Sequence, residues 1–193
     1  MIEPCYKHIN QGKRSDLNTD PPINIYTFKS KIINQQYIIE VLYFKYDILV
    51  IQFFLKTHRH SEKRFSLLIP ASETKENNNK HVFMLLNTIV NIAKELMHKN
   101  PKASLGFMGA PKLKEQEVAY NGENINPDNT IKNTSRHRVY SLYVKRYFSP
   151  ELFTHIEYED SSCYLLKNNK NDLLDKKTAD SYLNETIESK NSN

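Results

Sequence analysis

Apolar and polar residues alternate along the first third of the chain, as they do in half-buried β-strands. In the stretch from Ile25 to Lys31, the alternation places Tyr26, Phe28 and Ser30 on one face and the polar residues on the other. Three further strand-like stretches follow at 37–45, 48–56 and 64–69, of which 48–55 is apolar on both faces, as in a central strand. They are separated by short polar connections that favour hairpins. This pattern predicts an antiparallel β-meander.

The next periodic segment, from His81 to Lys99, has the spacing of an amphipathic helix. Its apolar residues recur every three or four positions, at Val82, Leu85, Leu86, Ile89, Ile92, Ala93 and Leu96. An asparagine among 77–79 would cap the start, and Asn100-Pro101 would end the helix. A short strand is predicted at 103–108.

A second helix is predicted from Thr134 or Ser135, either of which can cap it, to Phe148. Its apolar side would consist of Val139, Tyr140, Tyr143, Val144 and Tyr147, and its polar side of Arg138, Ser141 and Lys145. The stretches 154–159 and 162–166 flank a polar turn, which indicates a closing β-hairpin.

These elements predict an α+β fold: an antiparallel β-meander of four or more strands with two helices packed on one face. We expect an irregular arm at 1–22, a single domain at 23–166 and a flexible polar and acidic tail at 167–193. The predicted core consists of Phe28, Val41, Ile51, Phe53, Leu85, Ile89, Ile92, Leu96, Phe107, Tyr143 and Tyr147.

Composition excludes several classes of protein. With 12 Tyr and 9 Phe among 193 residues, the chain as a whole is not of the disordered type. Two cysteines cannot form a disulfide framework, and no apolar run reaches the ~18 residues of a membrane span. The N-terminus lacks the pattern of a signal peptide, so we expect a cytoplasmic protein. Four glycines argue against a glycine-rich phosphate loop, and no cofactor is predicted.

Charge is distributed unevenly. Residues 1–150 contain 22 basic and 13 acidic side chains, whereas residues 151–193 contain five and nine. This asymmetry fits either a basic surface for an anionic partner or an ordinary solvated surface, and we favour the second.

The strongest candidate for a functional surface is the basic second helix. Lys132, Arg136, Arg138, Lys145 and Arg146, together with His137, lie within fifteen residues, and tyrosines alternate with them. Such residues can bind an anion or a base, can pair with acids inside the protein, or can form an ordinary surface. We favour pairing and ordinary surface together over anion binding. Because cations are unfavourable at a helix N-terminus, something should compensate Arg136 and Arg138.

The long connection 109–134 adds two candidate binding residues, Lys112 and Tyr120. Connections of this length without regular structure are often functional. The candidate binding residues, for an anion or a partner, are therefore Lys112, Tyr120, Lys132, Arg136, Arg138, Lys145 and Arg146.

Other chemical motifs are weaker. His58 and His60 could share one face, but a metal site needs more ligands than are nearby. Cys163 with His155 could form a nucleophile and base, but the neighbouring acids disfavour a thiolate. The segment 106–112 lacks the helix that a phosphate loop requires, and Glu157 with Glu159 is more typical of a strand edge than of a cation site. We therefore predict no catalytic residues and no metal.

The run from His81 to Tyr147 resembles small bacterial and phage families without known activity. The matching residues are Leu86, Thr88, Ile89 and Val90 in the first helix, then Ser135, Arg136, Arg138, Val139 and Tyr140 in the second. The resemblance covers about the middle half of the chain, from which the 109–134 insert departs. It implies a β-meander with two helices in a prokaryotic or mobile-element setting. Because these families carry no known activity, it transfers no catalytic residues.

These observations favour a non-enzymatic binding module, a protein adaptor or inhibitor of the kind encoded in a phage or defence locus. A protein partner is expected, and no membrane. Two alternatives stay open: a nucleic-acid-binding protein that uses the basic helix at 132–146, and an enzyme of unknown class. The oligomeric state does not follow from the sequence.

Overall fold

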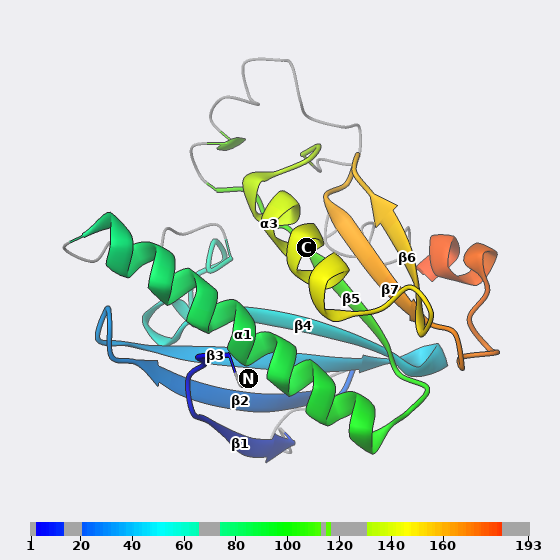
Figure 1. Cartoon of the computed structure of the whole chain (residues 1–193), viewed down its shortest axis with the longest axis horizontal. Coiled ribbons are helices and arrows are strands. Elements are labelled where there is room, and N and C mark those ends of the chain that lie inside the picture. Colours follow the sequence, from blue (N-terminus) through cyan, green and yellow to red (C-terminus); the bar gives the residue numbers. More distant parts are fainter. Residues whose placement is uncertain (1–2, 14–20, 66–73, 113–114, 117–130, 183–193) are drawn as a thin grey trace. The chain divides into compact units, whose positions relative to one another are not determined.

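The computed structural model describes residues 3–13, 21–65, 74–112, 115–116 and 131–182. The fold is α+β, as predicted, and the chain divides into two compact units. Unit 1 comprises residues 1–45 and 49–101, and unit 2 comprises residues 46–48 and 102–193 (Figure 1). The single domain expected at 23–166 stays a prediction.

Unit 1 contains the predicted β-meander. Its strands are β1 (His8–Lys13), β2 (Ile23–Ser30), β3 (Gln35–Phe44) and β4 (Ile48–Leu55), in the order β1-β2-β3-β4. The alternation expected in β2 is confirmed, because Tyr26, Phe28 and Ser30 are all buried. The fourth strand predicted at 64–69 lies almost entirely outside the described residues.

The irregular arm expected at 1–22 is wrong for its middle part, because strand β1 pairs antiparallel with β2. This strand has little pattern in the sequence, since five of its six residues are exposed. The ladder shifts register between Asn10 and Gly12, where the backbone N–H of Gly12 donates to the Asn10 side chain. Such a bulge twists an edge strand and limits its pairing with other chains.

Helix α1 (Lys75–Lys99) begins six residues earlier than its apolar pattern predicts. The Thr74 side chain caps it by accepting a hydrogen bond from the backbone N–H of Asn77, so residues 77–79 lie inside the helix. The first turn is polar and exposed, which is why the apolar period does not detect it.

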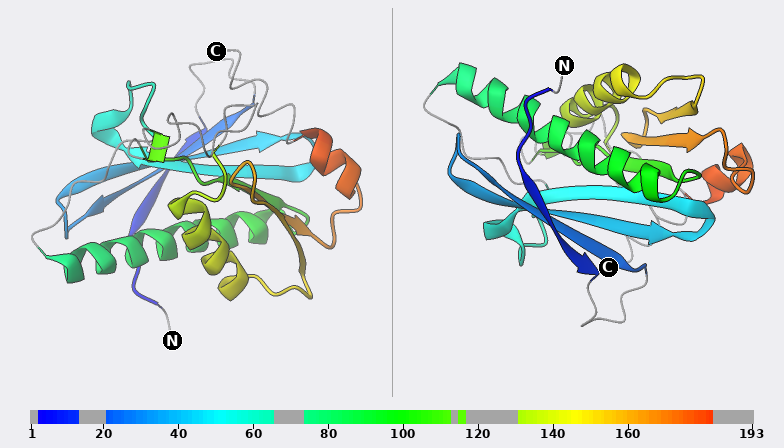
Figure 2. Two further views of the ribbon diagram at one scale, coloured as in Figure 1. Left: turned by 90° about the horizontal axis from the view of Figure 1, so that it is seen from above. Right: turned by 60° about the horizontal axis from the view of Figure 1, so that its bottom comes forward.

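The buried face of α1 is rotated slightly from the predicted one. Leu85, Ile92 and Leu96 are buried as expected, but Ile89 is half-buried and Val82 is 38% exposed. His81 and Thr88 are buried in their place. The helix lies along one face of the strands of unit 1 (Figures 1 and 2). Of the remaining predicted core residues, Phe28 and Val41 are buried, whereas Ile51, Phe53, Phe107, Tyr143 and Tyr147 are half-buried.

Unit 2 contains β5 (Ser104–Met108), α3 (Ser135–Tyr147), β6 (Phe153–Tyr158) and β7 (Cys163–Asn168). Its strands follow the order β5-β7-β6 with both pairs antiparallel. The predicted 154–166 hairpin is confirmed, and α3 packs against β7. Each of the two long helices thus belongs to a different unit.

The tail expected to be flexible from residue 167 is ordered as far as the structure describes it. Strand β7 continues to Asn168, and residues 176–182 are helical. Asn171, Leu174 and Ala179 are each only 1% exposed. The Asn171 amide donates to the backbone oxygen of Tyr46 at 2.8 Å, and the Tyr158 hydroxyl donates to Asp180. The segment is polar in composition, but its buried residues Asn171, Leu174 and Ala179 attach it to the rest of unit 2.

Candidate binding surface on helix α3

Two chain segments fix the start of α3. The Thr134 side chain accepts a hydrogen bond from the backbone N–H of His137, and its own hydroxyl donates to the backbone oxygen of Gly109. The Thr134 backbone N–H donates to Ser162 Oγ at 2.9 Å. The helix cap predicted from sequence is therefore confirmed at Thr134, and it is attached both to the end of β5 and to the β6–β7 turn.

Glu115 supplies the compensation expected for the cations in the first turn of α3. Its carboxylate accepts hydrogen bonds from the backbone N–H groups of Ser135 at 2.9 Å and Lys112 at 2.8 Å. Burial acts to raise the pKa of Glu115, but these two donors outweigh it and leave the pKa below its ordinary value. An ionised carboxylate thus stands at the positive end of the helix dipole.

The face of α3 that packs against the rest of unit 2 differs from the predicted apolar side. His137, Ser141 and Val144 are buried, at the four- and three-residue spacing of one helix face. The predicted members Tyr140, Tyr143 and Tyr147 are half-buried at its margins. Ser141, predicted to be on the polar side, is inside, and Val139 is 39% exposed.

The opposite side of α3 combines apolar and basic residues. Arg138, Val139, Leu142, Lys145 and Arg146 are all exposed, Leu142 to 70%. Their spacing of one, three and four residues places them along a single outward stripe. We call these five residues the α3 stripe. The helix contains no Asp or Glu, so the stripe is purely cationic around its two apolar members.

Two of the predicted binding residues form ion pairs within unit 2. Lys145 Nζ lies 2.9 Å from Glu157 Oε2 on β6, and Lys132 Nζ lies 2.8 Å from Asp160 Oδ1 in the turn that follows. Burial acts to raise the pKa of Glu157, but the hydrogen bond and charge of Lys145 outweigh it and lower that pKa. Internal pairing, the interpretation favoured from sequence, therefore describes both lysines.

The arginines of the helix make different contacts. Arg138 Nη1 donates to the backbone oxygen of Asn133 at 2.6 Å, and Arg136 Nη1 donates to that of Ala110 at 3.2 Å. The Arg146 guanidinium lies 5.5 Å from the centre of the Tyr147 ring. Lys112 is half-buried near the Glu115 cap, and Tyr120 lies outside the described residues. The structure thus gathers Arg138, Lys145 and Arg146 on one surface and leaves Lys112, Lys132 and Arg136 beside it.

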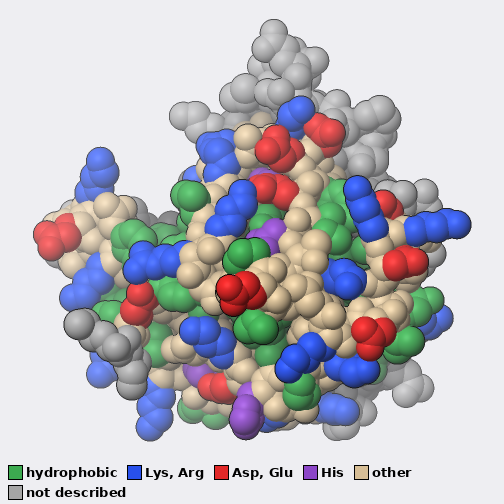
Figure 3. Space-filling view, turned by 45° about the vertical axis from the view of Figure 1, so that its right-hand side comes forward, with side chains coloured by type: hydrophobic (Ala, Val, Ile, Leu, Met, Phe, Trp, Pro, Cys, Tyr) green, Lys and Arg blue, Asp and Glu red, His purple; other side chains and the backbone are tan. Residues whose placement is uncertain are grey.

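The surface around this helix is electrostatically mixed. Figure 3 shows Lys and Arg side chains interspersed with Asp and Glu, without an extended basic area on the described part of this face. Sequence-independent binding to nucleic acid relies on several unpaired cations that neutralise phosphates. The arrangement therefore fits a local, shaped contact better than a broad phosphate-binding surface.

The weaker chemical motifs do not assemble into a reactive site. His155 is aligned with Leu166, not Cys163, and its ring contacts the Tyr164 hydroxyl at 2.7 Å and the backbone oxygen of Phe148 at 3.0 Å. Burial raises the pKa of Tyr164 to about 12, so this hydroxyl stays protonated at neutral pH. Strand β6 ends at Tyr158, so Glu159 lies in a turn and does not share a strand face with Glu157. Among the described residues, no three His, Cys, Asp or Glu side chains are grouped as a metal site would need.

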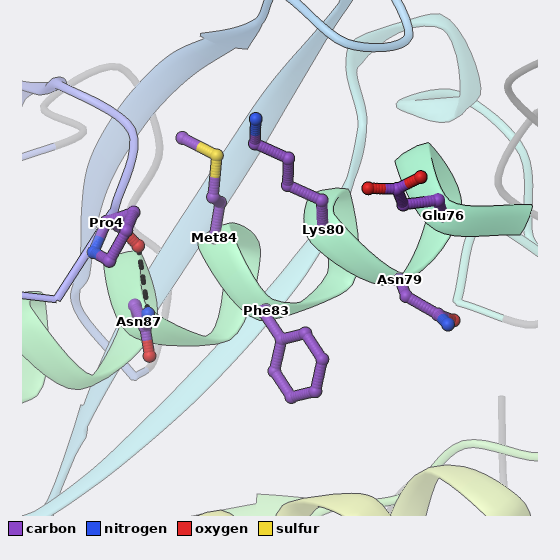
Figure 4. Close-up of a pocket in the computed structure, with 7 residues that line it drawn as sticks. All are labelled: Pro4, Glu76, Asn79, Lys80, Phe83, Met84 and Asn87. Carbon is purple, nitrogen blue, oxygen red and sulfur yellow. Dashed lines mark hydrogen bonds between the residues drawn. The ribbon is translucent and has the colours of Figure 1, made fainter. Parts of the chain in front are cut away.

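A hollow on α1 of unit 1 is a poor candidate for a small-molecule site. It is lined by Pro4, Glu76, Asn79, Lys80, Phe83, Met84 and Asn87. In Figure 4, Phe83 and Met84 point in opposite directions, and the polar side chains do not converge on a common point. Ligand sites usually combine apolar walls with convergent polar groups, which this hollow lacks.

Sequence reasoning missed a buried polar cluster in unit 1, centred on His81. This side chain is 1% exposed, and its ring contacts Tyr6, Ser30 and Tyr37. The available signal was that His81 precedes Leu85 by four residues and so lies on the buried face of α1.

None of the helices in the described part of the chain has the length and apolar composition needed to cross a membrane.

Comparison with known proteins adds no relative: no family model matches the chain, and neither curated proteins nor solved structures give a match. The resemblance to bacterial and phage families thus stays an expectation from sequence.

Proposed function

We propose that this protein is a non-enzymatic binding module that docks on an acidic partner protein through the α3 stripe. The observation that carries the proposal is Leu142, which is 70% exposed at the centre of a stripe whose other members are Val139 and three cationic residues. A large apolar side chain surrounded by charged ones is the usual arrangement of an interface anchor with its polar rim.

Charge determines the kind of partner. Arg138 and Arg146 flank Leu142 at four residues on either side, and α3 carries no acidic side chain. A complementary surface would present carboxylates around an apolar pocket that receives Leu142 and Val139. Arginine suits this role because its planar guanidinium binds carboxylates in a bidentate manner.

A protein partner is preferred to nucleic acid for two reasons. Lys132 and Lys145 already form ion pairs with Asp160 and Glu157, so a phosphate would have to compete with these acids. In addition, Leu142 and Val139 can neither hydrogen-bond to phosphates nor offer an aromatic ring on which bases stack, so the centre of the stripe lacks the groups typical of sequence-independent binding.

The test is a selection from a random peptide display library on the immobilised full chain. We expect the recovered peptides to be acidic, with a large apolar residue among the acids. Leu142→Asp should weaken their binding by at least ~10-fold, and a double Arg138→Glu, Arg146→Glu variant should do the same. Leu173→Asp is the matched control, because Leu173 is a leucine of the same unit with 66% exposure. It should leave binding unchanged.

Three results would contradict the proposal. The first is the recovery of no acidic peptides, and the second is binding that is insensitive to the Leu142→Asp change. The third is salt-dependent binding of a mixed-sequence oligonucleotide that the double arginine variant abolishes, which would assign the helix to nucleic acid. Circular dichroism of each variant would show that the fold is retained.

A further inference from the structure

The N-terminal segment of unit 1 is bound to α1 in the manner of a peptide ligand. Residues 3–7, which we call the strap, precede β1 and cross the helix (Figure 2). The backbone N–H of Tyr6 donates to Thr88 Oγ1 at 2.9 Å, and the Asn87 amide donates to the backbone oxygen of Pro4 at 2.8 Å. The latter bond is drawn in Figure 4. The Asn91 amide contacts the Cys5 sulfur at 3.2 Å.

These helix residues form a polar row suited to an extended backbone. Asn87, Thr88 and Asn91 share one side of α1 at one- and three-residue spacing. Asn87 is 8% exposed and Thr88 is fully buried. The Thr88 hydroxyl donates to the backbone oxygen of Met84 at 2.7 Å, so its oxygen is left to accept from the backbone N–H of Tyr6. Because a buried polar group gains stability from each such bond, this row favours a peptide backbone beside it.

The aromatic ring of Tyr6 fills a hollow between α1 and the strands. Tyr6 is 5% exposed and its ring stacks on Phe28, with the centroids 5.0 Å apart and the planes at 9°. Phe28 in turn stacks on Tyr37 at 4.9 Å and 5°. The strap therefore contributes one end of a stack of three rings, with Phe28 in the middle and Tyr37 at the other end.

The phenolic oxygen of Tyr6 meets buried polar groups that match it. Ser30 Oγ donates to it at 3.0 Å, and it lies 2.8 Å from His81 Nδ1. Burial lowers the pKa of His81 to about 4, so the ring is neutral at pH 7. One ring nitrogen of a neutral histidine donates and the other accepts, so the ring can bond both the Tyr6 hydroxyl at Nδ1 and the Tyr37 hydroxyl at Nε2, 2.9 Å away. Ser30, Tyr37 and His81 are each no more than 1% exposed.

We propose that unit 1 contains a binding site for an extended peptide segment with a tyrosine anchor, and that the strap occupies this site as an intramolecular ligand. The polar row of α1 binds the peptide backbone, and the hollow formed by Phe28, Ser30, Tyr37 and His81 receives the phenol. Unlike β1, which pairs with β2 through a strand ladder, the strap is attached by side-chain hydrogen bonds from a helix. In this proposal, a tyrosine-bearing segment of another protein competes with the strap for the site, while β1 stays paired with β2. The site is independent of the α3 stripe.

The experiment uses the full chain with Tyr6→Ala, which empties the hollow and retains the rest of the strap. The probe is a fluorescent synthetic peptide with the sequence of residues 3–9 and serine at the position of Cys5. We expect the variant to bind it, and a probe with alanine in place of the tyrosine to bind at least ~30-fold more weakly. The parent should bind at least ~10-fold more weakly than the variant, because its own strap competes at a high effective concentration.

Two results would overturn the proposal. One is a folded Tyr6→Ala protein that binds both probes equally or not at all. The other is equal binding of the tyrosine probe by parent and variant. If Tyr6→Ala does not fold, millimolar tyrosine peptide should restore cooperative urea unfolding, because a ligand of the native state stabilises it. Failure to restore it, or equal restoration by the alanine peptide, would contradict the proposal.

Discussion

Glu115 Oε1 accepts a hydrogen bond from the backbone N–H of Ser135 at 2.9 Å, so a carboxylate twenty residues upstream completes the N-terminus of α3. The helix begins with a serine followed by Arg136 and Arg138 and has no acid in its first turn. Without Glu115, no negative charge would balance these two cations at the positive end of the helix dipole. This contact therefore determines how stably the α3 stripe is presented.

Replacing Glu115 with Gln should lower the free energy of unfolding by about 1 kcal/mol, since a charge-assisted cap is lost. The native pKa of Glu115 is lowered, so its contribution is present above the unfolded pKa and is lost as pH falls through the native pKa. Urea denaturation of parent and Glu115→Gln should therefore differ at pH 7 and converge as the pH falls through the native pKa of Glu115. Glu151→Gln, at an exposed position, is the control; equal effects of both changes would contradict the assignment.

Because His81 is buried, we expect the free energy of unfolding to fall as the pH is lowered from 6.5 to 4. Burial lowers its native pKa to about 4, so in this range the unfolded chain binds a proton that the native state does not. The effect on the free energy of unfolding should be on the order of 2 kcal/mol, allowing for residual solvation of the ring. Thermal melts should show a flatter pH dependence for His81→Gln than for the parent. His98→Gln, at an exposed position on the same helix, should retain the slope of the parent.

Leu174 should be as important for folding as a core residue, although it lies in a polar segment. It is 1% exposed, whereas its neighbour Leu173 is 66% exposed. We expect Leu174→Ala to lower the free energy of unfolding by ~2–4 kcal/mol and Leu173→Ala by less than ~0.5 kcal/mol. Urea denaturation of this pair tests whether the segment docks. Similar small effects of the two changes would instead support the flexible tail that the sequence predicts at 167–193.

Gly109 should not tolerate a side chain. A Cβ atom placed there would lie 2.5 Å from the backbone nitrogen of His137 and 2.7 Å from its Cα. Because these are backbone atoms, α3 would have to shift, and we expect Gly109→Ala to lower the free energy of unfolding by ~1–3 kcal/mol. Ala110→Gly is a neighbouring control for altered chain flexibility. Stability and display-peptide binding that are unchanged in Gly109→Ala would show that the helix start can move freely.

The elements that sequence predicted well are those defined by local patterns. The alternation in β2, the Thr134 cap and the 154–166 hairpin each depend on residues close together in the chain. Strand β1 was missed because its residues are mostly exposed, so its formation depends on the neighbouring strand β2 and not on burial. The polar first turn of α1 was missed for the same reason.

The candidate surfaces required the tertiary structure. Sequence concentrated the cations at 132–146, but only the folded hairpin brings Glu157 to Lys145 and Asp160 to Lys132. The rotation of α3 was equally undetermined, because tyrosines, a serine and a histidine compete for the buried face. Packing against β7 places Ser141 inside and Leu142 outside.

The sequence by itself determined the fold class, most of the helices and strands, and the position of the basic helix, because these follow from short-range periodicity and capping. The tertiary structure alone decided which residues surround His81: Tyr6, Tyr37 and Ser30 lie 75, 44 and 51 residues away along the chain. No local pattern encodes such contacts, since a histidine on a helix and a tyrosine near the N-terminus are each compatible with many surroundings. Their energetics arise only when burial removes water and leaves each polar atom dependent on the others.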